Sequence, residues 1–156
     1  MIKQELYNEI QKYIELNSSI EESTYSIKLD ACICKQELVV EPEASFSETL
    51  LQYIKDKKLN DSDVYNRANI DRRLFSKIRN NKDYKPSKPT ILALCIALKL
   101  DIDKTEDLLE RAGFALSHSD KADIIVRFFI EEKEDYTLFD VDEALISFDL
   151  KPISNY

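Results

Sequence analysis

Basic residues gather in one part of this acidic chain, between Ser62 and Pro89. That stretch holds eight lysines and arginines against three aspartates, a net charge of +5, whereas residues 1–61 carry −5 and residues 90–156 carry −8. The eight cations are Arg67, Arg72, Arg73, Lys77, Arg79, Lys82, Lys85 and Lys88. Cationic side chains attract phosphates, and arginine also pairs with guanine, so the stretch is typical of a nucleic-acid contact. A solvated helix face can have the same composition, and the elements that hold these residues decide between the two.

The spacing of apolar residues around this stretch predicts a series of short helices. Asp61 and Asp71 are suited to cap the two helices that carry most of the cations, and Asn69-Ile70 supplies a tight turn between them. Ser87 caps the next helix, which is nearly all apolar and therefore expected to be buried. The five expected helices cover about residues 45–58 (capped by Ser45 or Ser47), 62–68, 72–80, 91–100 and 103–113 (starting at Asp103 or Thr105 and ending at Gly113).

The stretch Leu59–Leu109 resembles the lambda-repressor-like, or XRE-type, helix-turn-helix family. Five short helices of suitable lengths come in the family's order, and the segment PSKPTILALCIALKLDIDKTEDLL follows the family's hydrophobic pattern closely. The family usually has glycine in the turn between its two central helices and again after the recognition helix. Here those places fall on Asn69 and Asn81. Because asparagine is the best substitute for glycine in a left-handed backbone, both residues are expected to adopt one.

The resemblance implies a set of DNA contacts. The first two residues of the recognition helix, and a third one turn later, are expected to contact base edges: Arg72, Arg73 and Lys77. Phosphate contacts are implied for Asn80, Asn81 and Lys82, with Lys85 close enough to add to them. Phe75 and Ile78 fall on the inward face of the same helix and are expected to be core.

The flanks of this region carry further predicted elements. Residues 2–16 have helical spacing, and alternating apolar residues within 25–40 predict a short pair of strands. Two C-terminal helices are expected at about 121–132 and 141–148, the second capped by Asp140. The predicted fold is thus mainly α, a five-helix lambda-repressor-like unit with two extra C-terminal helices and an N-terminal helix and strand arm. The expected domains are 1–44, the arm; 45–116, the helix-turn-helix domain; and 117–156, a helical extension packed on it.

Apolar residues of the C-terminal third are numerous for a fold that five helices already close. They are most simply core, but part of them fits a dimer face or a partner groove: Ile124, Ile125, Phe128, Phe129, Phe139, Leu145, Ile146 and Phe148. Residues 45–150 also resemble a module found at the C-terminus of varied bacterial proteins. That resemblance is compatible with DNA binding and with protein docking.

Several classes of function lack the residues they need. The single glycine, Gly113, excludes most glycine-rich phosphate loops, and one histidine with three cysteines has no zinc-site spacing. No pair of acids has a catalytic arrangement, so neither an enzyme nor a cofactor is expected. No apolar run approaches the roughly 18–20 residues of a membrane span. The acidic, amphipathic N-terminus is neither a signal nor a transit peptide, which favours a cytoplasmic protein.

The residues and the resemblance together predict a non-enzymatic, sequence-specific regulator of transcription. It would insert residues 72–80 into the major groove of double-stranded DNA, as a homodimer on a pseudo-palindromic site, and repress by covering a promoter. The alternative is a protein-interaction module, either an antitoxin or a phage-defence or anti-defence adaptor, in which the helix-turn-helix is a scaffold. The N-terminal arm or the C-terminal helices would then hold the partner.

Overall fold

A computed structural model describes residues 2–18 and 43–154 of the chain. Those residues form eight α-helices and no strand, which confirms a mainly helical fold. The predicted strand pair within 25–40 lies outside the described residues. The helices are α1 (Gln4–Ser18), α3 (Phe46–Asp56), α4 (Asp61–Arg67), α5 (Arg72–Asn80), α6 (Lys88–Ala97), α7 (Ile102–Arg111), α8 (Lys121–Glu132) and α9 (Leu138–Ser147).

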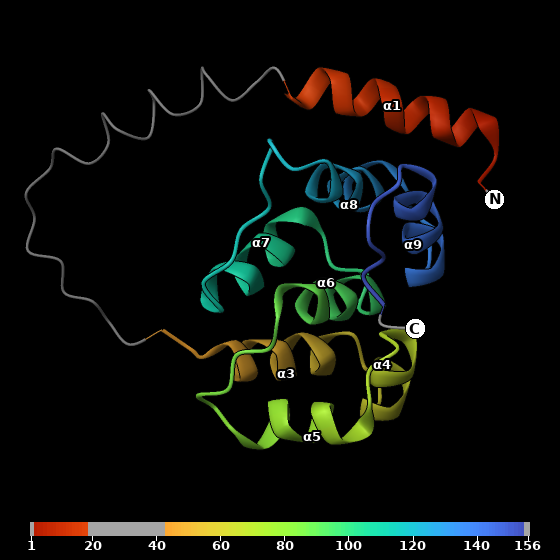
Figure 1. Ribbon diagram of the computed structural model, residues 1–156. Helices are drawn as coiled ribbons and strands as arrows, with labels where there is room; N and C mark the ends of the chain where they lie inside the picture. The colour runs from red at the N-terminus through yellow and green to blue at the C-terminus, as the bar shows by residue number, and fades with distance from the viewer. Residues whose placement is uncertain (1, 19–42, 155–156) are drawn as a thin grey trace, which may run out of the picture.

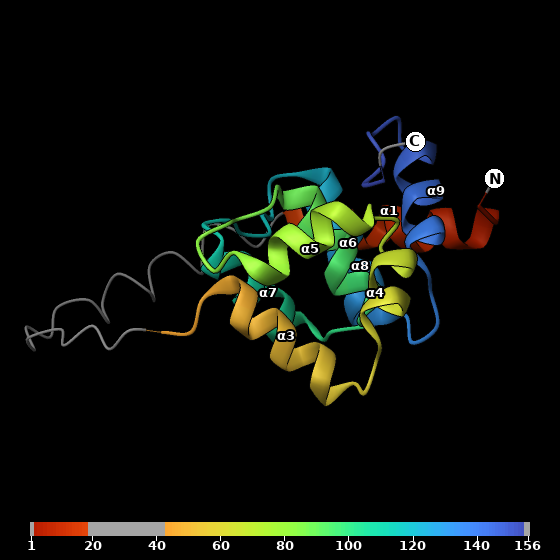
Figure 2. The ribbon, with the colours of Figure 1, turned by 90° about the horizontal axis from the view of Figure 1, so that it is seen from below.

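The helices are stacked so that α5 and α1 lie on opposite sides of the molecule. In Figure 1, α3, α4 and α5 form the lower part, α6 and α7 lie above them, and α8 and α9 come next, with α1 on top. Figure 2, seen from below, shows α5 crossing in front of α6, as expected for a helix on the outside. Among the described helices, none therefore covers the side of α5 that faces away from the core.

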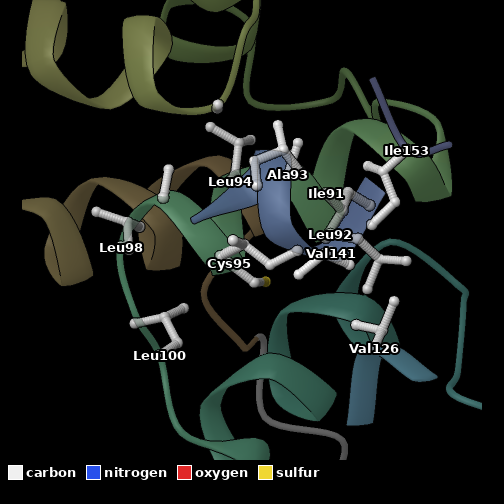
Figure 3. Close-up of a cluster of buried hydrophobic side chains, with 14 of the residues drawn as sticks. Ile91, Leu92, Ala93, Leu94, Cys95, Leu98, Leu100, Val126, Val141 and Ile153 are labelled. Atoms are coloured by element: carbon white, nitrogen blue, oxygen red, sulfur yellow. The ribbon is translucent and has the colours of Figure 1, made fainter. Parts of the chain in front are cut away.

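α6 is the central helix of the core. Every residue from Ile91 to Leu98 is buried. A helix that is apolar all round must be covered on all sides, and α4, α7 and α9 pack against this one. Figure 3 shows side chains of α6 meeting Val126 of α8, Val141 of α9 and Ile153 of the C-terminal segment. The C-terminal helices thus share one core with the helices that hold the cations.

Some helix starts differ from the prediction. α7 is capped by Asp101, whose side chain accepts from the amide of Lys104 at 2.9 Å, so the prediction of a start at Asp103 or Thr105 was wrong. α9 begins at Leu138 rather than Val141, and its cap is Thr137. Asp140 is instead the third residue of α9, where its carboxylate accepts from the amide of Thr137 at 2.7 Å in a capping box. These differences shift the helices by one turn or less.

The N-cap residues of α3 and α4 also differ from the prediction or decide between its alternatives. Ser45, not Ser47, caps α3, in a capping box with Glu48. Ser47 is buried, and its hydroxyl donates to the carbonyl of Ile78 at 2.6 Å, which ties α3 to the end of α5. Asp61 is the first residue of α4 and follows the N-cap residue Asn60, so the prediction that it is the cap was wrong by one position.

α1 covers the aromatic face of the C-terminal helices. Tyr7 stacks on Phe148 with the ring centroids 4.3 Å apart, and Tyr13 meets the edge of Phe128 at 5.3 Å. The hydroxyl of Tyr13 also donates to Glu131, and burial, together with this contact, raises the pKa of the tyrosine. Most of the C-terminal apolar residues are therefore core. Two on α9 stay exposed, Phe139 at 64% and Ile146 at 54%.

Candidate nucleic-acid interface

The turn between α4 and α5 fixes how these two helices meet. Asn69 has the predicted left-handed backbone, with φ of 51°. The amide of Ile70 donates to the carbonyl of Tyr65 at 2.9 Å and closes the turn. Asp71 then caps α5 as predicted, accepting from the amide of Arg73 at 2.8 Å. The turn therefore needs no glycine, and α5 starts directly after it.

α5 has a buried face and an exposed face. Phe75 and Ile78 are buried, as predicted, and the ring of Phe75 lies 5.8 Å from that of Tyr65 on α4. The exposed side chains include four of the predicted DNA contacts: Arg72, Arg73, Lys77 and Asn80. The amide of Asn80 donates to the hydroxyl of Ser76 at 3.1 Å, one turn back. One helix thus anchors itself by its apolar face and presents the predicted contacts together on the other.

The remaining predicted contacts follow α5 and are also exposed: Asn81, Lys82 and Lys85. Asn81 does not have the predicted left-handed backbone, because its φ is −119° and its ψ 103°. Its amide closes α5 by donating to the carbonyl of Lys77, and a turn follows, in which the amide of Tyr84 donates to the carbonyl of Asn81 at 3.2 Å. The asparagine side chain serves a different purpose, accepting from the amide of Asp83 at 3.1 Å.

Three of the eight cations form ion pairs with residues that the structure describes. Arg79 pairs with Asp61 at the start of α4. Lys82 lies 2.7 Å from Glu48, and this contact lowers the pKa of the glutamate and raises that of the lysine. These pairs are exposed, so salt and solvent weaken them, and an incoming phosphate can compete for the cations.

The third pair points into the protein. Lys88 lies 2.7 Å from Asp123, which is buried and also accepts from the amide of Ser117 at 2.8 Å. This carboxylate joins the start of α6 to the loop before α8 and to α8 itself. Lys88 therefore neutralises a buried acid and is not available to a ligand. This pairing could not be predicted from the sequence alone.

The other cations are free among residues 2–18 and 43–154. Arg67, Arg72, Arg73 and Lys85 are exposed and form no ion pair with any residue in those ranges. Lys77 lies 4.4 Å above the ring of Tyr84, a cation–π contact that leaves its charge at the surface. The free positive charges thus concentrate on α5 and the loop that follows it.

Comparison with known proteins identifies the element that carries this surface. Residues 49–113 match the family model of the Cro/C1-type HTH DNA-binding domain. Residues 49–113 are thus similar to a Cro/C1-type helix-turn-helix domain. The match runs from α3 to the end of α7 and confirms the resemblance to the XRE-type family. No curated protein and no solved structure matches the chain. The contact assigned to each residue and the wider resemblance over 45–150 remain predictions.

An open pocket lies within this helix-turn-helix, between the start of α4 and α5. Its volume is about 700 Å³, and its lining consists of Leu59, Asn60, Asp61, Ser62, Tyr65, Arg72, Phe75, Ser76 and Arg79. Asp61 therefore shares a recess with two cations, Arg72 and Arg79. An acid in this position opposes the approach of a phosphate, and it is the residue of the interface that the sequence pattern alone would not single out.

Asp61→Asn is expected to strengthen DNA binding by about 3- to 10-fold, because it frees Arg79 and removes a negative charge from the interface. If Arg79 then contacts a phosphate, the slope of log affinity against log salt should steepen by about one. Fluorescence anisotropy across a salt series measures both. Asp103→Asn is the matched control, since Asp103 is also an acid in the first turn of a helix but lies on α7. Equal gains from both variants would mean that only net charge matters.

Possible metal ligands do not cluster in the part of the chain that the structure describes. Residues 2–18 and 43–154 contain no cluster of histidine, cysteine and acidic side chains that could hold a metal ion. Cys95 is buried in α6, and burial raises the pKa of its thiol to about 12. Cys32 and Cys34 lie outside the described residues. None of the described helices is long and apolar enough to cross a membrane.

Proposed function

We propose that this protein is a sequence-specific DNA-binding regulator of transcription that inserts α5 into the major groove. The observation that carries the proposal is the exposed face of α5, where Arg72, Arg73 and Lys77 stand free of ion pairs with the described residues. In a helix-turn-helix this is the face that reads base edges. Two adjacent arginines favour a site that contains guanines, because arginine donates to both O6 and N7 of that base.

The net charge of −8 does not oppose this proposal, because residues 62–89, which include α5, carry a net charge of +5. Residues 121–147 hold eight acids against three bases, and they form α8 and α9, which lie between α5 and α1 in Figure 1. Charges further away than about 8–10 Å are largely screened at physiological salt. The local field at α5 therefore governs contact with DNA, and the acidic side repels the backbone only if the molecule approaches in the wrong orientation.

The proposal includes a homodimer on a pseudo-palindromic site. One α5 of nine residues spans about 13.5 Å, which covers few base pairs, and regulators of this architecture gain specificity by placing two copies one helical turn apart. Repression would follow when the bound dimer covers promoter sequence.

An anisotropy titration with genomic DNA fragments tests the proposal. At about 50 mM salt we expect binding, and at about 200 mM a loss of at least 100-fold in affinity for random sequence, since a protein with several phosphate contacts loses that much. Some fragments should resist the higher salt, and those contain the operator. If no fragment binds at 50 mM, the protein is not a DNA-binding regulator.

A protein-interaction role is the second candidate, and the exposed side of α9 favours it. Phe139 and Ile146 are seven residues apart, so they lie on the same side of that helix, two turns from each other. Large exposed apolar groups at this spacing can anchor a partner, as an antitoxin or an adaptor would require. Phe139→Ser/Ile146→Ser is expected to leave DNA affinity within about 2-fold of the wild type. If function in cells survives Arg72→Ala/Arg73→Ala but is lost in Phe139→Ser/Ile146→Ser, the protein is an interaction module.

A further inference from the structure

One acidic residue stands at the tip of α5 among the free cations. Asp71 is the N-cap of this helix, and its side chain is exposed. One carboxylate oxygen, Oδ1, accepts from the amide of Arg73 at 2.8 Å and so fixes where the group lies. The second oxygen has no hydrogen bond or ion pair with any residue of 2–18 or 43–154. The tip thus offers a positioned acceptor beside two arginines.

Asp71 differs from three other acids that lie near the same cations. Asp61, Glu48 and Asp123 each neutralise one cation, Arg79, Lys82 and Lys88 respectively. Asp71 pairs with neither Arg72 nor Arg73, although both follow it directly in the chain. Its charge therefore does not serve to hold an arginine in place.

Capping does not require the charge either. Serine and asparagine cap helices about as well as aspartate, and they would not repel phosphates. A negative charge at the tip of a helix that enters the groove lowers affinity unless it meets a hydrogen-bond donor there. The donors that bases offer in the major groove are the N4 amine of cytosine and the N6 amine of adenine.

We propose that Asp71 selects cytosine at one position of the operator, an inference that rests on the proposed DNA-binding function. A carboxylate only accepts hydrogen bonds, so the amine of cytosine suits it. Adenine suits it less, because the acceptor N7 lies next to the N6 amine and repels the second oxygen, whereas cytosine has a C–H group at that place. With Arg72 and Arg73 reading guanines, the tip of α5 would specify a short run of G·C pairs.

Selection from a random DNA library tests this inference with four forms of the full chain. The wild type is compared with Asp71→Ser, which keeps a capping hydroxyl, and with Asp71→Asn, which keeps a capping amide. Asp83→Asn is the matched control, because it removes one exposed negative charge from the loop after α5. Thermal melts establish that all four are folded, and binding to matched duplexes then measures the preference at each position.

We expect the wild type to prefer cytosine at one position by about 10-fold or more, and Asp71→Ser to lose that preference while the guanine positions stay. Asp71→Asn should move the same position towards adenine, since asparagine both accepts from N6 and donates to N7. Asp83→Asn should change overall affinity alone. Identical preferences in wild type and Asp71→Ser would overturn the role of Asp71 and leave the proposed function intact. No enrichment by any form would overturn both.

Discussion

Arg72→Ala/Arg73→Ala is expected to weaken specific DNA binding by about 100-fold or more. Each arginine that pairs with a base contributes about 1–3 kcal/mol of discrimination, and a factor of ten in affinity corresponds to about 1.4 kcal/mol. The fold should be unaffected, because both side chains are exposed, neither pairs with a described residue, and alanine favours a helix. Anisotropy with the selected operator and with random DNA, at about 50 and 200 mM salt, measures the loss in both.

The matched control removes two cations from the other side of the molecule. Lys12 on α1 and Lys121 at the start of α8 are exposed and form no ion pair with a described residue. Lys12→Ala/Lys121→Ala makes the same change in net charge and is expected to alter affinity by less than about 3-fold. Equal losses in the two double variants would mean that long-range charge, and not α5, determines binding. Equal losses would also mean that the cations of α5 form only a solvated helix face.

Short-range signals in the sequence predicted the helices that hold the interface. Apolar spacing and cap residues act within one or two turns, so they locate elements well: α8 has the predicted bounds, 121–132, and Asp71 has the predicted role. The error at α9 was of the same local kind. Thr137 and Asp140 can both cap, and the spacing of three between them is that of a capping box, which makes the threonine the cap.

The pairing of charges could not be predicted, because it depends on how helices pack. Asp61 and Arg79 are 18 residues apart, and Glu48 and Lys82 are 34 apart, so no periodicity within one helix links them. Lys88 looked like one more cation of the interface until the fold placed a buried acid beside it. The sequence thus predicts that the region is positive, and the fold shows which of its cations are not paired with described acids.

Backbone conformation at Asn69 and Asn81 shows the limit of reasoning from residue type. Both were expected to be left-handed, and only Asn69 is. Between α4 and α5 the chain must reverse within a few residues, and a positive φ accomplishes that. After α5 the backbone of Asn81 is extended and the turn comes only at residues 82 and 83, so the helix end does not require a positive φ at Asn81. The need for a special conformation comes from the path of the chain, and the residue type only permits it.

The position of α1 is a third feature that the sequence alone could not predict. Its apolar spacing showed that one side is buried, yet 24 residues separate Ser18 from Glu43, and a pattern within α1 cannot name its partner. The partner is the aromatic face of α8 and α9. Glu9 on α1 pairs with Lys133 at 2.7 Å, beside the ring contacts made by the two tyrosines. The first helix therefore completes the core formed by the last two.

Phe129→Ala tests whether this shared core makes the described helices one cooperative unit. Phe129 is 2% exposed, and its ring lies 5.6 Å from that of Phe128 and 5.7 Å from that of Tyr136. Removing a buried phenylalanine ring costs about 3–5 kcal/mol, through lost burial and the cavity left behind. Since domains of this size are stable by about 5–15 kcal/mol, the variant should be strongly destabilised. Denaturant unfolding, followed by circular dichroism and by DNA binding, measures the cost.

The two probes decide how far the effect spreads. α9 packs on α6 and α8 packs on α7, so loss of order at Phe129 should reach the helix-turn-helix, and both signals should fall in one transition at lower denaturant. Phe139→Ala is the control, because that ring is 64% exposed and its removal should change stability by no more than about 0.5 kcal/mol. Two transitions, with DNA binding lost only in the later one, would contradict a single unit. In that case α1, α8 and α9 would form an appendage that the helix-turn-helix does not need for its fold.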